Sequence, residues 1–161
     1  MKISMLILNL IFLASANADS TCKSVQLGET KIEPRSKATY TILKVIERRK
    51  MRGEAMLEMA GPDHKCISMK SFSELSLVMV RHRSGAIGTS VLVQKELLSF
   101  YRLKDGELEL VDEVELSHTE QTGDKTETLF KRSFDLEEKK DGLRVIVRES
   151  TGGGSKEYLI R

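Results

Sequence analysis

The stretch ELLSFYRLKDGELELVDEVEL, residues 96–116, decides the fold class of this 161-residue chain. Asp105-Gly106 separates two runs rich in apolar residues, and this dipeptide permits the positive φ angles that a two-residue hairpin turn requires. In residues 107–116, leucine and valine alternate with glutamate, apart from an irregularity at Val111-Asp112. The stretch therefore predicts a β-hairpin whose second strand has one apolar face and one solvated face.

The same pattern of short apolar runs and turn residues extends in both directions. Turns are predicted at residues 122–125 and at Asp141-Gly142, and strands at about 37–47, 54–59 and 66–69. Strands at this spacing indicate an all-β fold: a single antiparallel β-barrel or sandwich of about 8–10 strands in hairpin or meander order.

Residues 71–84 fit two structures. Ser71 and Glu74 have the spacing of a helix capping box, which predicts a short helix. Leu75, Leu77 and Met79 alternate with polar or smaller residues, which predicts a strand. We favour the strand and keep one short helix as the alternative.

The first 18 residues have the layout of a cleaved secretory signal peptide. Lys2 is followed by the apolar run 3–13, which at 11 residues is shorter than the roughly 20 that cross a bilayer as a helix. Ala16-Asn17-Ala18 supplies the small residues of a cleavage site before Asp19. We therefore expect one all-β domain over residues 19–161, exported to a periplasm or the extracellular space, without stable membrane insertion.

Cys22 and Cys66 are the only cysteines in the chain. Asp19, three residues before Cys22, does not fit the pattern of a lipid-attachment site, and the cysteines lack the CxxC spacing of redox-active thiols. In an oxidising compartment the two thiols are predicted to form a disulfide.

The sequence around Cys66 also raises the possibility of copper binding, because thioethers and imidazoles are copper ligands. Core packing is the better explanation of the methionines, so the chain is predicted to have no metal or other cofactor. The copper candidates are Met51, Met56, Met59, His64 and Met69.

Charge is distributed unevenly. Residues 19–94 carry 13 basic and 8 acidic side chains, and residues 95–161 carry 12 and 16. The asymmetry is too small to indicate a nucleic-acid partner. The densest basic stretch, ERRKMR at 47–52, has two interpretations: a contact for acidic lipid or polysaccharide, or a solvated turn between strands.

Catalytic motifs are not evident. The chain has no G-x-S-x-G nucleophile elbow, and TGGGS at 151–155 lacks the lysine and helix of a P-loop. The favoured function is a non-catalytic binding protein, an inhibitor or partner of an extracytoplasmic protein or an envelope component. The alternatives are a barrel that carries an apolar ligand and a hydrolase that uses a carboxylate pair. Binding loops are predicted to contain Arg83, Ser84, Gly85, Gly152, Gly153 and Gly154.

Overall fold

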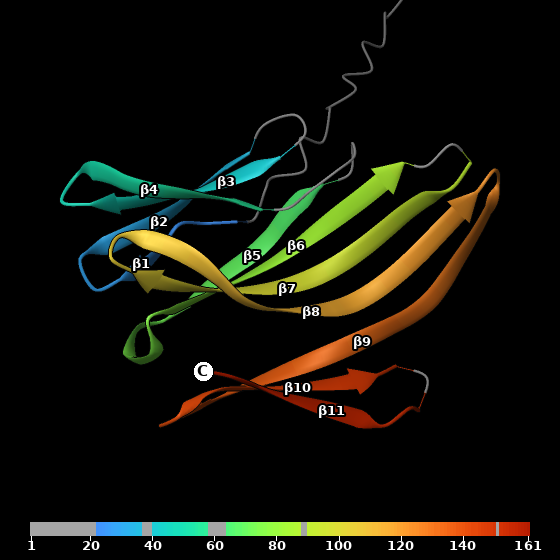
Figure 1. Cartoon of the computed structure of the whole chain (residues 1–161). Coiled ribbons are helices and arrows are strands. Elements are labelled where there is room, and N and C mark those ends of the chain that lie inside the picture. The colour runs from blue at the N-terminus through green and yellow to red at the C-terminus, as the bar shows by residue number, and fades with distance from the viewer. Residues whose placement is uncertain (1–21, 37–39, 58–63, 88–89, 151) are drawn as a thin grey trace, which may run out of the picture.

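The computed structural model describes residues 22–36, 40–57, 64–87, 90–150 and 152–161. These residues form two antiparallel sheets in meander order, as Figure 1 shows, which confirms the predicted all-β class. The four-stranded sheet contains β1 (Val25–Leu27), β2 (Thr30–Ser36), β3 (Thr41–Glu47) and β4 (Lys50–Leu57). The seven-stranded sheet contains β5 (Lys65–Phe72), β6 (Leu77–Ile87), β7 (Leu92–Lys104), β8 (Glu107–Thr122), β9 (Lys125–Lys139), β10 (Gly142–Glu149) and β11 (Ser155–Ile160). Both sheets are open, so the arrangement is that of a sandwich.

The hairpin predicted over residues 96–116 is formed by β7 and β8. Asp105 and Gly106 connect the strands with φ angles of 52° and 84°. Tyr101 pairs with Leu110 and Phe100 with Asp112, so Val111 is the extra residue of a β-bulge. The irregularity was therefore predicted at the correct place.

The bulge overturns the prediction of one apolar face along β8. An extra residue shifts the alternation by one, so side chains before and after it point to opposite faces. Leu108 packs into one core, whereas Val114 and Leu116 belong to the other, and Leu110 is 55% exposed.

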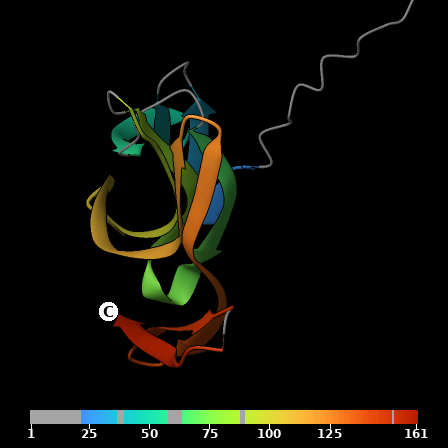
Figure 2. The ribbon, with the colours of Figure 1, turned by 90° about the vertical axis from the view of Figure 1, so that its right-hand side faces the viewer.

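Two cores share the strands β6 and β7. Val78 and Val80 face the four-stranded sheet, and Leu77 and Met79 face the opposite side. On that side the large sheet folds back at β9, so that β10 and β11 lie beneath the central strands (Figure 2). The molecule therefore has three layers, with β6 and β7 in the middle one.

One of the two cores lies between the folded-back strands and the central layer, and we call it the second core. Its buried members come from β5 to β8, from β10 and from β11: Phe72, Leu77, Met79, Leu98, Phe100, Val114, Leu116, Leu143, Val145, Val147 and Ile160.

A disulfide joins Cys22, just before β1, to Cys66 on β5, as predicted. The two Cα atoms are 5.5 Å apart, and both residues are buried. The bond connects the four-stranded sheet to the edge strand of the large sheet. The predicted signal peptide, residues 1–18, and its cleavage site before Asp19 lie outside the described residues.

The ambiguous segment at 71–84 is mainly strand. Ser73–Leu75 form a single 3-10 turn before β6 begins at Leu77, and the residue at its N-cap is Phe72, without a side-chain hydrogen bond. The capping-box interpretation of Ser71 is therefore wrong, because Ser71 is paired with Val78 in the sheet. In the part of the chain that the structure describes, no helix is long and apolar enough to cross a bilayer.

Candidate functional site

The solvent side of the four-stranded sheet carries the most exposed large apolar side chains. We call this surface the outer face and define it by the outward-pointing residues of β2, β3 and β4. The strand pairing places these residues in three rows that run across the strands. The rows are Arg35–Ile42–Met56, Glu33–Lys44–Glu54 and Lys31–Ile46–Met51.

Two methionines dominate the outer face. Met56 is 66% exposed and Met51 is 59% exposed, the two largest values among the exposed large apolar side chains. Each sits beside a half-buried isoleucine, Ile42 or Ile46, of the neighbouring strand. Isolated exposed apolar residues need no explanation, but paired ones on a single sheet face are characteristic of a contact surface.

Each charged side chain of the middle row has an oppositely charged neighbour on the outer face. Lys31 donates a hydrogen bond of 3.0 Å to Glu33, Arg35 forms a second ion pair with Glu33, and Lys44 lies 3.8 Å from Glu54. The hydrogen bond from Lys31, helped by the charges of Arg35, Lys31 and Lys44, lowers the pKa of Glu33. The two acids of the middle row are therefore each paired with basic side chains of the same face.

The turn between β3 and β4 continues the outer face with positive charge. We call Arg48, Arg49 and Lys50 the basic turn; all three are exposed. Glu47 pairs with Lys50, so the loop has two residues, and both have positive φ angles, 46° at Arg48 and 67° at Arg49. The interpretation of 47–52 as a solvated turn between strands is confirmed.

Acidic side chains hold the turn and the residues beside it. Arg48 Nε lies 3.1 Å from a carboxylate oxygen of Glu29 in the β1–β2 turn, and Arg52 Nε lies 2.9 Å from Glu47. Gly53 abuts the β7–β8 turn so closely that a Cβ there would be 2.8 Å from the carbonyl oxygen of Gly106. The hairpin is thus held by contacts at and beside its turn, whereas Arg49 and Lys50 remain exposed.

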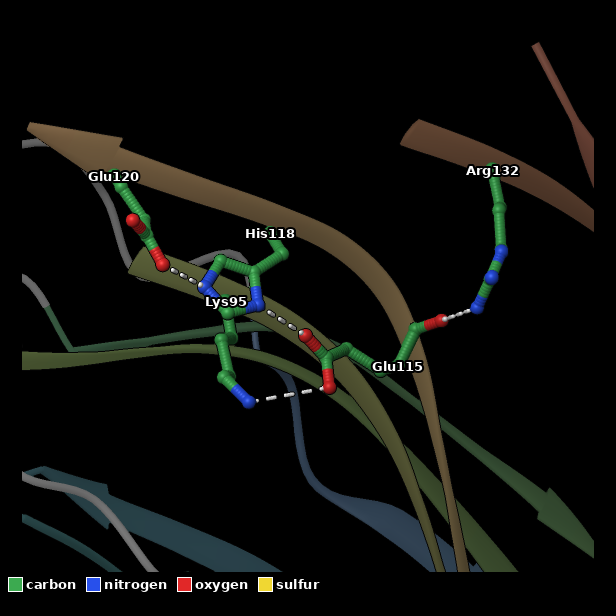
Figure 3. A network of polar contacts seen from close by, with 5 residues as sticks. All are labelled: Lys95, Glu115, His118, Glu120 and Arg132. Carbon is green, nitrogen blue, oxygen red and sulfur yellow. Dashed lines mark hydrogen bonds and ion pairs between the residues drawn. The ribbon is translucent and has the colours of Figure 1, made fainter. Parts of the chain in front are cut away.

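A second group of polar residues lies at the far end of β7, β8 and β9 (Figure 3). His118 Nε2 is 3.2 Å from Glu120, and its Nδ1 is 3.1 Å from Glu115, which also pairs with Lys95 at 3.2 Å. Arg132 donates to the backbone carbonyl of Glu115. Because the carboxylates face opposite nitrogens of the ring, they do not converge with it on a common point.

A third group is buried near the disulfide. His82 and Ser99 are 1% and 0% exposed, and their Nε2 and Oγ atoms are 2.7 Å apart. Ser99 donates in turn to Glu113 at 2.7 Å, so Nε2 of His82 is the donor to Ser99 and its Nδ1 is left without a hydrogen-bond partner. Burial lowers the pKa of His82 to about 4.

This buried chain does not form a nucleophilic site. In a serine hydrolase the histidine accepts the proton of an accessible serine, and an acid orients the histidine. Here Ser99 lies between the histidine and the acid and is fully covered, so a substrate cannot reach its hydroxyl.

The copper candidates are not brought together. Met51 and Met56 are on the outer face of β4, whereas Met69 on β5 packs against the core beneath the sheet. Cys66 is in the disulfide, His64 lies just before β5, and Met59 is outside the described residues. Among the residues that the structure describes, no group of three or more histidines, cysteines and acids is placed to hold a metal ion.

The predicted binding loops are only partly loops. Gly152, Gly153 and Gly154 lie in the connection between β10 and β11, as expected. Arg83, Ser84 and Gly85 instead lie within β6, which corrects their assignment to a loop. The strand continues through Gly85 because β7 is long enough to pair with it, Gly85 with Gln94 and Ile87 with Leu92.

The outer face was missed at the level of the sequence. The alternation of Ala55 and Leu57 with Met56 was visible, and it placed Met56 away from the apolar side of the strand. The register that sets Met51 beside Ile46 depends on the bulge at Arg52, between the pairs Val45–Gly53 and Ile46–Met51, which has no local sequence signal. Comparison with known proteins finds no matching family model, curated protein or solved structure.

Proposed function

We propose that this protein is an exported, non-catalytic binding protein that recognises an extracytoplasmic protein, as its inhibitor or stable partner, through the outer face. The observation that carries the proposal is the exposure of Met56 and Met51, 66% and 59%, beside half-buried isoleucines on one rigid sheet. Methionine and arginine are enriched at protein–protein interfaces, and both types occur on the outer face and its basic turn.

Rigidity supports recognition by this surface. In addition to the core that it shares with β6 and β7, the four-stranded sheet is held to the rest of the molecule by the Cys22–Cys66 disulfide and by the contact of Gly53 with the β7–β8 turn. A surface that is already ordered loses little conformational entropy when a partner binds. The outer face is therefore suited to binding without rearrangement.

Export is supported by two independent features. Residues 1–18 have the pattern of a signal peptide, and the described chain contains a disulfide, which persists in oxidising compartments. Edman sequencing of the mature protein is expected to begin at Asp19, and both cysteines should resist alkylation until a reductant is added.

Site-specific photo-cross-linking tests the proposal. Benzoylphenylalanine is placed at Met56 on the outer face and, as a matched control, at Leu129 on β9, which is 50% exposed. In the producing cells, the probe at position 56 should give one adduct of defined mass, and the purified partner should bind the wild-type protein saturably. Equal adduct patterns at positions 56 and 129, or none at 56, would contradict the proposal.

A further inference from the structure

We infer that the partner presents an acidic surface with an exposed apolar or aromatic group, and that the basic turn and the adjoining methionines bind it. This inference rests on the proposed function and specifies the chemistry of the partner. It is carried by the unfavourable backbone of the basic turn, by its unpaired charges and by its position beside Met51.

The basic turn has a backbone conformation that its residues do not favour. A two-residue hairpin with positive φ at both positions favours Asn-Gly or Asp-Gly, because residues with a larger side chain are strained in the left-handed region. The β7–β8 hairpin uses Asp105-Gly106, whereas the β3–β4 hairpin has Arg48 and Arg49. Strained backbone conformations cluster at functional sites, which points to a use for the two guanidinium groups.

Positive charge at the end of the hairpin is left available. Arg48 is held by Glu29, and Arg52 by Glu47. Arg49 and Lys50 are exposed and have no ion-pair partner within the described ranges. The surrounding segment adds to their field, since described residues 22–57 contain eight basic and four acidic side chains. Guanidinium groups bind carboxylates through two parallel hydrogen bonds, which favours an acidic partner.

The methionines add an apolar component next to these charges. Met51 and Ile46 form the row of the outer face that lies next to the turn, so a partner that binds this face and reaches Arg49 at the end of the hairpin also covers this pair. Thioethers make favourable contacts with aromatic rings, and methionine adapts its shape to a partner. The combination fits an acidic surface that carries an aromatic or other apolar side chain.

A protein fits this surface better than an anionic lipid bilayer. The middle row carries the carboxylates of Glu33 and Glu54 on the same face. A lipid surface is uniformly negative and can only compete with these acids for Lys31, Arg35 and Lys44. A protein can offer positive and negative groups in a pattern that matches the mixed charges of this face. The bilayer remains an alternative outcome of the test.

Acidic polypeptides provide probes for the test. The full disulfide-bonded protein is titrated with poly-L-glutamate and with a glutamate–tyrosine copolymer of matched length, and the methyl NMR signals of Met51 and Met56 are followed. Both polymers should shift these signals at low ionic strength, and the copolymer should bind about two- to tenfold more tightly because it adds aromatic contacts. Met51→Ser/Met56→Ser should remove that difference, with binding then followed by the Arg49 Nε–H signal.

Charge reversal locates the binding site. Arg49→Glu/Lys50→Glu should weaken binding of both polymers about tenfold or more. The matched control is Lys125→Glu/Lys140→Glu, which reverses two exposed hairpin lysines elsewhere in the protein and should leave binding unchanged. Equal weakening by the two variants, or unchanged binding in the first, would overturn the inference.

Three further results would also overturn it. If the methionine signals shift on raising the protein concentration alone, the occupant is a second copy of the chain. If they shift with phosphatidylglycerol vesicles and with neither polymer, it is a membrane. A cross-linked partner at position 56 that has a basic surface would refute the acidic chemistry and leave the proposed binding function intact.

Discussion

His82 is a buried histidine whose imidazole ring is neutral near pH 7. Its ring lies between the two sheets, where Nε2 donates to Ser99 and Nδ1 has no hydrogen-bond partner. Protonation would place a second N–H and a full charge in this buried space, and burial therefore depresses the pKa of the ring to about 4. The residue links the stability of the fold to pH.

The free energy of unfolding should fall as the pH decreases from about 6.5 to about 4. In this window the unfolded chain takes up a proton on His82, whereas the folded protein does not, so acid favours unfolding. The shift corresponds to a loss of about 3 kcal/mol in total, with no further loss from His82 below its folded pKa. Urea unfolding at several pH values measures it.

His82→Gln isolates this effect because glutamine retains a donor near the position of Nε2 and does not titrate. The difference in stability between wild type and variant should change across pH 4 to 6.5 and be constant above it. A difference that stays constant over the whole window would show that His82 is not the group responsible. Glu33 and Glu137, whose pKa values are lowered by hydrogen bonds from Lys31 and Lys139 respectively, contribute equally in both proteins.

At the scale of the elements, the β3–β4 hairpin combines an unfavourable turn with close contacts at and beside that turn. Arg48 and Arg49 both have positive φ angles, and each costs free energy relative to the Asn-Gly pair that this turn favours. If the side chains serve binding, stability and function should respond in opposite directions to replacement of the turn.

Arg48→Asn/Arg49→Gly should stabilise the protein by about 1–2 kcal/mol. The exposed Arg48–Glu29 ion pair that is lost contributes little, because both side chains are at least 70% exposed and screened by water. Urea unfolding should show a higher midpoint with an unchanged slope, while polyglutamate binding decreases. A lower midpoint would show that the turn is not strained.

Gly53→Ala should destabilise the protein because a Cβ at this position would be 2.8 Å from the carbonyl oxygen of Gly106. The backbone of the β7–β8 turn cannot move aside as a flexible side chain can, and overpacking of this kind costs about 1–3 kcal/mol. Gly154→Ala is the matched control, since a Cβ added there would have no other atom within 4 Å. Equal unfolding midpoints for the two variants would contradict this account of Gly53.

The bulges mark the limit of what sequence pattern predicts for these elements. The Asp105-Gly106 turn and the irregularity at Val111 could be recognised because both depend on local residue types. That Leu108 and Val114 enter different cores depends on which residue the partner strand skips. Likewise, Gly85 was expected to lie in a binding loop, but pairing with Gln94 holds it in β6. Neither result is encoded locally.

At the scale of the whole molecule, one covalent bond ties the two sheets together. Cys22 and Cys66 are 44 residues apart, and the bond between them closes a loop that contains the entire four-stranded sheet. It was predictable because a chain with two cysteines has one possible pairing, and the expected export places the thiols in an oxidising compartment. The outer face was not predictable, because its rows form only when three strands pair in a particular register.

Cys22→Ser/Cys66→Ser should lower the free energy of unfolding by about 4 kcal/mol, as expected from the entropy of closing a loop of this length. The double variant avoids a lone reactive thiol. Calorimetry should show a lower Tm for the variant than for the oxidised wild type and a similar decrease on reduction of the wild type. An unchanged Tm would mean that the sheets are held together by packing alone.

The central position of β6 and β7 determines how the protein opens. Their side chains enter both cores, so peeling away either outer layer leaves these strands covered on one side and still paired along both edges. Their amide protons should be released to deuterated solvent only when the whole molecule unfolds. Those of β11, an edge strand paired only with β10, should exchange far earlier. The backbone of these two strands thus provides a direct measure of global stability, residue by residue.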